Sequence, residues 1–177
     1  MRLFIAFGVS DETGAELSSA QRQLEHASLN PVKSFHLTLK FLGDVDERKL
    51  KMIKERLEKV SFKSFDACLY GMGVFPSENK ARVIWAGVEP EDRINSLQKQ
   101  VEDSLNDLFP EDRRFHPHIT IARVKAIEDR ELFRKCLRSI RIKKKRFTVK
   151  SFSLIRSTLT NEGPQYEVLQ EYPAKDL

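Results

Sequence analysis

A short pattern, His-x-Thr in an alternating apolar frame, occurs twice in this chain. The two copies are Phe35-His36-Leu37-Thr38-Leu39 and Pro117-His118-Ile119-Thr120-Ile121. Because successive side chains of a strand point to opposite faces, each histidine shares a face with its threonine, and the leucines and isoleucines face the core. The repeated pattern therefore predicts two half-buried strands, near residues 34–42 and 117–124, that present the same pair of polar groups.

Apolar periodicity and turn residues divide the rest of the chain into further strands and helices. Strands are predicted near 1–9, 64–74, 81–88, 145–158 and 164–171, and helices near 11–27, 46–60, 91–108 and 128–140. The order of elements repeats in the second half, and the offset between the histidines also carries Trp85 onto Glu167 in the last predicted strand. Repetition of this kind indicates an internal duplication.

The expected fold is α+β, with residues 1–177 forming a single two-lobed domain. Duplicated strand-and-helix halves favour a bilobal arrangement in which two antiparallel sheets are flanked by helices. A pseudo-twofold axis between the halves would then place His36 opposite His118. The two motif strands would form the floor of a central cleft.

Composition narrows the class of protein. Hydrophobic residues make up 40% and charged residues 32% of the chain, which is typical of a folded domain. The apolar residues 1–9 are too few for a signal peptide. No segment has a run of apolar residues close to the length of about 18 that is needed to span a bilayer. We therefore expect a soluble, cytoplasmic protein without a membrane partner. The net charge of +5 fits an anionic partner such as RNA.

Two imidazoles and two hydroxyls on one surface suit acid–base chemistry on a phosphate ester. The free pKa of histidine, near 6.5, lets one ring accept a proton while another donates one. The threonine hydroxyls can hold the non-bridging phosphate oxygens while the rings flank the attacking and leaving oxygens. A single His-x-Thr in a strand is more often structural, but two copies in the same frame favour a function.

The motifs resemble those of a known family. The segments 36–43 and 117–123, His-Leu-Thr-Leu-Lys-Phe-Leu-Gly and Pro-His-Ile-Thr-Ile-Ala-Arg, are similar to the two signatures of the two-histidine phosphoesterases. Within them the chain most resembles the RNA 2′,3′-cyclic phosphodiesterases, also called 2′-5′ RNA ligases (LigT-like). The resemblance extends over essentially the whole chain, including the strand at 82–87.

The resemblance implies a metal-independent hydrolase, without a cofactor, that opens a terminal 2′,3′-cyclic phosphate on RNA, or on a small cyclic nucleotide, to a 2′-phosphate. It implies that His36 and His118 are catalytic, with His118 activating water and His36 protonating the 3′ oxygen, or the reverse. Substrate binding would fall to Thr38 and Thr120, which hold the phosphate, with Arg123 adding charge and Phe41 contacting the terminal base or ribose. Both Phe41 and Arg123 lie five residues past their histidines, so a bulge or the end of the strand must turn them to the same face. We expect a monomer without an obligate protein partner.

Several alternatives stay open at this stage. The enzyme could act instead as an RNA ligase on cyclic-phosphate and 5′-hydroxyl ends, or the site could bind RNA ends without chemistry. His116 forms a His-x-His pair with His118, but no further ligand stands at zinc-binding spacing, and a structural use is favoured. The same holds for Cys68 and Cys136, which are expected to be small buried residues. Basic residues that could follow an RNA backbone are Lys33, Arg113, Arg114 and the run 141–146.

Overall fold

The computed structural model describes residues 1–176 as nine strands, four α-helices and one short 3-10 helix. In chain order these are β1 Arg2–Gly8, α1 Asp11–Arg22, β2 Ala27–Pro31, β3 His36–Asp44, α2 Glu47–Leu57, β4 Phe65–Phe75, η1 Glu78–Lys80, β5 Val83–Glu89, α3 Glu91–Leu105, β6 His118–Ile127, α4 Arg130–Ser139, β7 Arg146–Val149, β8 Ser151–Thr160 and β9 Gly163–Pro173. The mixture of helices with an antiparallel sheet agrees with the predicted α+β class.

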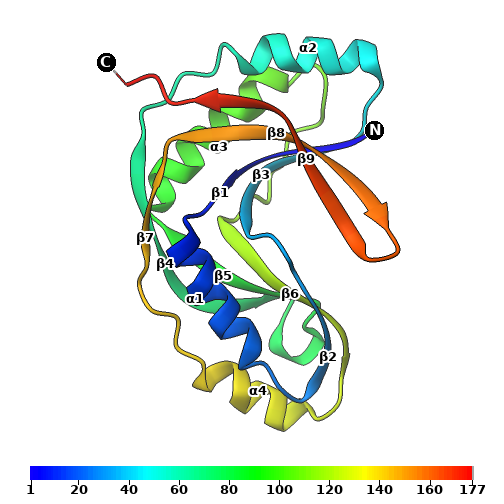
Figure 1. Cartoon of the computed structure of the whole chain (residues 1–177), viewed down its shortest axis with the longest axis vertical. Helices are drawn as coiled ribbons and strands as arrows, with labels where there is room; N and C mark the ends of the chain where they lie inside the picture. Colours follow the sequence, from blue (N-terminus) through cyan, green and yellow to red (C-terminus); the bar gives the residue numbers. More distant parts are fainter. Residues whose placement is uncertain (177) are drawn as a thin grey trace.

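All nine strands belong to one curled antiparallel sheet, in the order β7-β4-β5-β6-β3-β1-β8-β9, with β2 pairing with β6 as well (Figure 1). The two central strands, β3 and β6, are joined only at Leu37 and Ile119. The prediction of two separate sheets is therefore wrong, because β3 and β6 pair with each other and join all the strands into one sheet. This narrow junction divides the sheet into two sides, β7-β4-β5-β6 and β3-β1-β8-β9.

The central strands have corresponding inner neighbours on the two sides of this junction. On one side β3 pairs with β1, and on the other β6 pairs with β5. The helix that follows each of these partners packs across the junction: α1, after β1, lies against β6, and α3, after β5, lies against β3. The sheet therefore holds its two halves together through helices as well as through the single pair of residues.

The halves in space are not the two halves of the chain. The segment 145–158, predicted as one strand, breaks at Lys150 into β7, which pairs with β4, and β8, which pairs with β1. The C-terminal hairpin β8–β9 thereby joins the side that contains β1 and β3. Trp85 pairs with Thr120 just as Ala6 pairs with Thr38, so Ala6 and not Glu167 occupies the matching register position.

The first helix is shorter than its periodicity predicts. Ser10 caps α1 by accepting a hydrogen bond from the backbone NH of Thr13, as the sequence indicates. The helix ends at Arg22, however, and His26 adopts a left-handed backbone with φ 64°. This turn redirects the chain into β2, which pairs with the far end of β6 and which the sequence analysis missed.

Both motif strands carry a β-bulge at the same place. Leu39 has no partner on β1, because Ala6 pairs with Thr38 and Ile5 with Lys40. Ile121 likewise has no partner on β5. Its carbonyl instead accepts hydrogen bonds from the backbone NH of Val32 and from the Gln21 side chain, at 3.1 and 2.7 Å. The bulges expected from the sequence are present in both strands.

A buried ion pair fixes β3 against α3. The Lys40 ammonium donates to both carboxylate oxygens of Glu102 at 2.8 Å, and both side chains are about 95% buried. The same ammonium donates to the carbonyl of Pro110, and Glu102 accepts from the backbone NH of Asp112. The pair therefore ties the first motif strand to the segment between α3 and β6, which leads into the second motif.

Candidate active site

The structure brings the two His-x-Thr motifs together at the centre of the sheet. Leu37 and Ile119 pair and are fully buried, so their neighbours on either side project to the opposite face. We call this face, which carries His36, Thr38, His118 and Thr120, the histidine face. An antiparallel register makes the two histidines diagonal neighbours, which are typically about 7–8 Å apart. Such a separation accommodates a phosphate between the rings.

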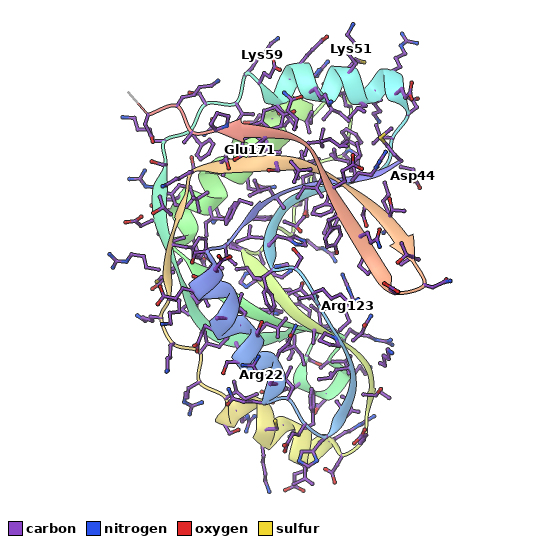
Figure 2. All side chains as sticks on the ribbon, in the orientation of Figure 1. Arg22, Asp44, Lys51, Lys59, Arg123 and Glu171 are labelled. Carbon is purple, nitrogen blue, oxygen red and sulfur yellow. The ribbon has the colours of Figure 1, made fainter. Side chains whose placement is uncertain are left out.

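The two bulges turn Phe41 and Arg123 onto the histidine face. In β3, Leu39 and the following Lys40 are both buried, and Phe41 is 70% exposed. In β6 the bulged Ile121 and the next residue are buried in the same way, and Arg123 is exposed. Figure 2 labels Arg123 on β6, on the side of the β8–β9 hairpin. All six residues singled out as site residues therefore lie on one face.

An aromatic group surrounds His36. The Phe4 ring lies 5.1 Å from the imidazole, and the Tyr166 ring meets it edge-on at 5.4 Å. The Phe41 ring in turn packs near Phe4, at 6.2 Å. These side chains come from β1, β9 and β3, so no local pattern in the sequence connects them. They shield His36 from water on the side of the hairpin.

A second aromatic group surrounds His118. The Phe75 ring meets the imidazole edge-on at 5.0 Å, and the Trp85 ring lies at 6.2 Å. His116 stacks parallel to His118 at 6.4 Å, which gives this residue a packing role. Trp85 covers Gly73 so closely that a Cβ at Gly73 would overlap the indole ring. Glycine is therefore required at position 73.

The second histidine is held in a defined tautomer. Its Nδ1 lies 2.6 Å from the carbonyl oxygen of His116, and this oxygen can only accept a hydrogen bond. The proton of the neutral ring therefore sits on Nδ1. Consequently, Nε2 of His118 is left with a free lone pair and can act as a base.

Burial makes both rings neutral at neutral pH. Burial is the main reason that the pKa of His36 is lowered to about 4, and the nearby Arg123 and His118 also lower this pKa. A hydrogen bond with the backbone of Ser34 raises it in part. Burial also lowers the pKa of His118, and the neighbouring charges of His116 and Arg123 act in the same direction. An anion bound between the rings would oppose both effects, because it favours the protonated imidazole.

We therefore expect sulfate to raise the pKa of His36 by about 1–3 units, because a negative charge within a few ångströms stabilises the imidazolium. The measurement is a histidine NMR titration with and without sulfate. Without sulfate, the midpoint for His36 should lie at about 4. Sodium chloride at the same ionic strength serves as the control and should leave the midpoint of His36 unchanged. A His36 midpoint that ignores sulfate would contradict an anion site between the rings.

The other candidate residues lie away from this face or in structural contacts. In the run 141–146, Lys145 pairs with Glu12 of α1 and Lys144 with Glu89, which engages these charges locally. Lys33 differs, because its ammonium donates to the carbonyl of Glu162 at the tip of the β8–β9 hairpin. The cysteines at 68 and 136 are free thiols and half-buried, less enclosed than predicted. Within residues 1–176, no three His, Cys, Asp or Glu side chains are grouped to hold a metal, and no helix could cross a membrane.

A curled antiparallel sheet with a His-x-Thr motif in each of its central strands defines a two-histidine phosphoesterase. Comparison with known proteins agrees, because residues 9–161 match the sequence model of the 2′-5′ RNA ligase superfamily. The chain belongs to this superfamily, and the resemblance predicted from its motifs is confirmed.

Individual relatives support the same placement. A Methanocaldococcus jannaschii protein named RNA 2′,3′-cyclic phosphodiesterase is 34% identical over 176 residues, covering 97% of this chain and 100% of the relative. A Thermotoga maritima protein of the same name is 36% identical over 178 residues, covering 97% and 94%. The crystal structure of a Thermus thermophilus protein matches with a TM-score of 0.81 at 31% identity, covering 98% of this chain and 97% of that one.

Proposed function

We propose that this protein is an RNA 2′,3′-cyclic phosphodiesterase that hydrolyses terminal cyclic phosphates to 2′-phosphates. The observation that carries the proposal is the pairing of the two His-x-Thr motifs on one face of the sheet, beside an exposed arginine. Relatives that align with nearly the whole chain bear the name of this activity. Small 2′,3′-cyclic nucleotides contain the same reacting group and are expected to be substrates.

The proposed mechanism uses the two imidazoles as base and acid. Nε2 of His118 accepts a proton from a water molecule, whose oxygen attacks the phosphorus. The bond from phosphorus to the 3′ oxygen breaks, and His36 donates a proton to that oxygen. The ring of His36 obtains this proton when the anionic substrate binds and raises its pKa. One proton is taken up and one is released, so the step is balanced without a cofactor.

The remaining polar groups of the histidine face hold the phosphate. The hydroxyls of Thr38 and Thr120 donate to the two non-bridging oxygens, and Arg123 adds positive charge where negative charge develops. The exposed ring of Phe41 offers an apolar surface to the terminal ribose or base. The common face of these four side chains, which alternation gives the threonines and the bulges give Phe41 and Arg123, supports these assignments.

The decisive assay offers an RNA with a 2′,3′-cyclic phosphate end, with and without a second strand that has a 5′-hydroxyl. We expect hydrolysis to the 2′-phosphate in both cases, because water is far more abundant than the competing hydroxyl. The products are identified by chromatography against synthetic 2′- and 3′-phosphate standards. Ligated product in excess of hydrolysed product would favour the ligase instead. Binding without turnover would favour a module that recognises RNA ends.

We also propose that the two sides of the sheet arose by duplication and form two lobes of one domain, related by a pseudo-twofold axis. The corresponding pairs β3–β1 and β6–β5, the matching bulges and the exchanged packing of α1 and α3 support this view. A monomeric state and a cytoplasmic location remain predictions from the sequence.

A further inference from the structure

The β8–β9 hairpin exposes apolar side chains on one of its two faces. Among residues 1–176, seven large hydrophobic side chains are exposed, and four of them lie on this hairpin or next to its inner face. Leu159 is 82% exposed, Val168 is 60% exposed and Tyr166 is 42% exposed, and the fourth is Phe41 on β3. The clustering is unusual, because scattered single apolar residues are the normal case on a protein surface.

The exposed apolar residues belong to the histidine face. Phe41 pairs with Phe4, Phe4 with Ile155 and Ile155 with Val168, so these side chains form one row across four strands. Tyr166 lies two residues before Val168 on the same side of β9 and contacts His36. The row thus begins at the candidate active site and runs outward along the hairpin.

The reverse face of the hairpin is polar. There Arg156 forms an ion pair with Glu167, its cross-strand partner. A two-stranded ribbon that projects from the body of the protein, as in Figure 1, should place apolar side chains on the face that packs against something. Within the described part of the chain these apolar side chains stay exposed, although Lys33 fastens the tip through the carbonyl of Glu162. The exposed apolar face of the hairpin is therefore a candidate binding surface.

We propose that this apolar strip, formed by Leu159, Tyr166 and Val168, binds the penultimate nucleotide of single-stranded RNA, the one that precedes the terminal nucleotide bearing the cyclic phosphate. The inference rests on the proposed function and identifies the substrate as an oligonucleotide. When the terminal phosphate of an RNA lies between the histidines, the rest of the RNA must extend from the site across the protein surface. The apolar strip is continuous with the site through Tyr166, which contacts His36. Bases of any sequence stack on aromatic and apolar surfaces.

Charge supports RNA as the occupant over a protein segment. Lys33, at the hairpin tip, and Arg123, on β6, are cations on the side of the site that the strip borders. Both can neutralise the phosphodiester that joins the terminal nucleotide to its neighbour. Apolar side chains under the base and cations beside the backbone are the usual combination for single-stranded nucleic acid.

The test compares a 2′,3′-cyclic mononucleotide with a tetranucleotide that ends in the same nucleotide. The double variant Leu159→Ser/Val168→Ser alters only exposed side chains, so its fold is retained. We expect kcat/KM for the tetranucleotide to fall about tenfold, while kcat/KM for the mononucleotide stays unchanged. Leu132→Ser, on α4 and 43% exposed, is the matched control and should leave both values as in the wild type.

The outcomes separate the inference from the function on which it rests. If the wild type hydrolyses neither substrate, the proposed function fails. Suppose instead that the wild type hydrolyses both substrates. If kcat/KM of the double variant then falls by the same factor on both, or falls on neither, the hairpin site is overturned. A wild type that dimerises in sedimentation, and a double variant that no longer does, would instead assign the strip to a second copy of the chain. That result also overturns the proposal.

Discussion

Replacement of His36 by alanine is expected to lower kcat on an RNA 2′,3′-cyclic phosphate by about 10²- to 10⁴-fold, because the 3′ oxygen then departs without a proton. The loss should disappear largely on a substrate whose 3′ oxygen is replaced by sulfur. A thiol has a pKa of about 8.5, so the thiolate leaves readily without general acid catalysis. Single-turnover kinetics on the two substrates measure the difference.

The variant His118→Ala provides the comparison for this experiment. If His118 is the base, its removal should cost a similar factor on both the oxygen and the sulfur substrate, because water still requires activation. Rescue of His118→Ala by sulfur, without rescue of His36→Ala, would reverse the two roles. Retention of full activity by both variants would exclude the two-histidine mechanism altogether.

Removal of one partner from the buried ion pair should cost more stability than any surface change in this protein. Lys40→Met leaves the Glu102 carboxylate buried without its cation, and we expect the free energy of unfolding to fall by about 3–5 kcal/mol. The double variant Lys40→Met/Glu102→Met removes both charges and should recover much of this loss. Guanidinium denaturation at neutral pH measures both changes.

A matched control is available on α3. Lys99 pairs with Asp103, but both side chains are more than half exposed. Lys99→Met should therefore lower the free energy of unfolding far less than Lys40→Met does. Equal losses in Lys40→Met and Lys99→Met would show that burial of the ion pair contributes nothing to the cost.

The central part of the site was predictable from the sequence. Alternation of apolar residues identified both motif strands and placed Leu37, Leu39, Ile119 and Ile121 in the core, where each is at most 1% exposed. The five-residue spacing between each histidine and Phe41 or Arg123 indicated either a bulge or the end of the strand, and the structure has a bulge in both strands. These properties depend on local geometry, which a period of two residues encodes directly.

Other features depend on contacts between distant segments and carry no local signal. Tyr166 contacts His36 only because the hairpin joins the side of the sheet that contains β1. The break at Lys150 was missed because β-forming residues flank it on both sides, and only the pairing of β7 and β8 with different strands separates them. Helical periodicity up to residue 27 hid the turn at His26.

The pairing of β8 with β1 has a consequence for the synthesis of the chain on the ribosome. The strand Arg2–Gly8 emerges before both of its partners, and β3 can pair with one of its edges soon afterwards. The other edge stays unpaired until residues 153–157 have been translated, much later in the chain. Until then the nascent polypeptide carries an open, apolar strand edge, the kind of surface on which unfinished chains aggregate. Strand β1 is thus made before all the other described strands but is among the last of them to be completed.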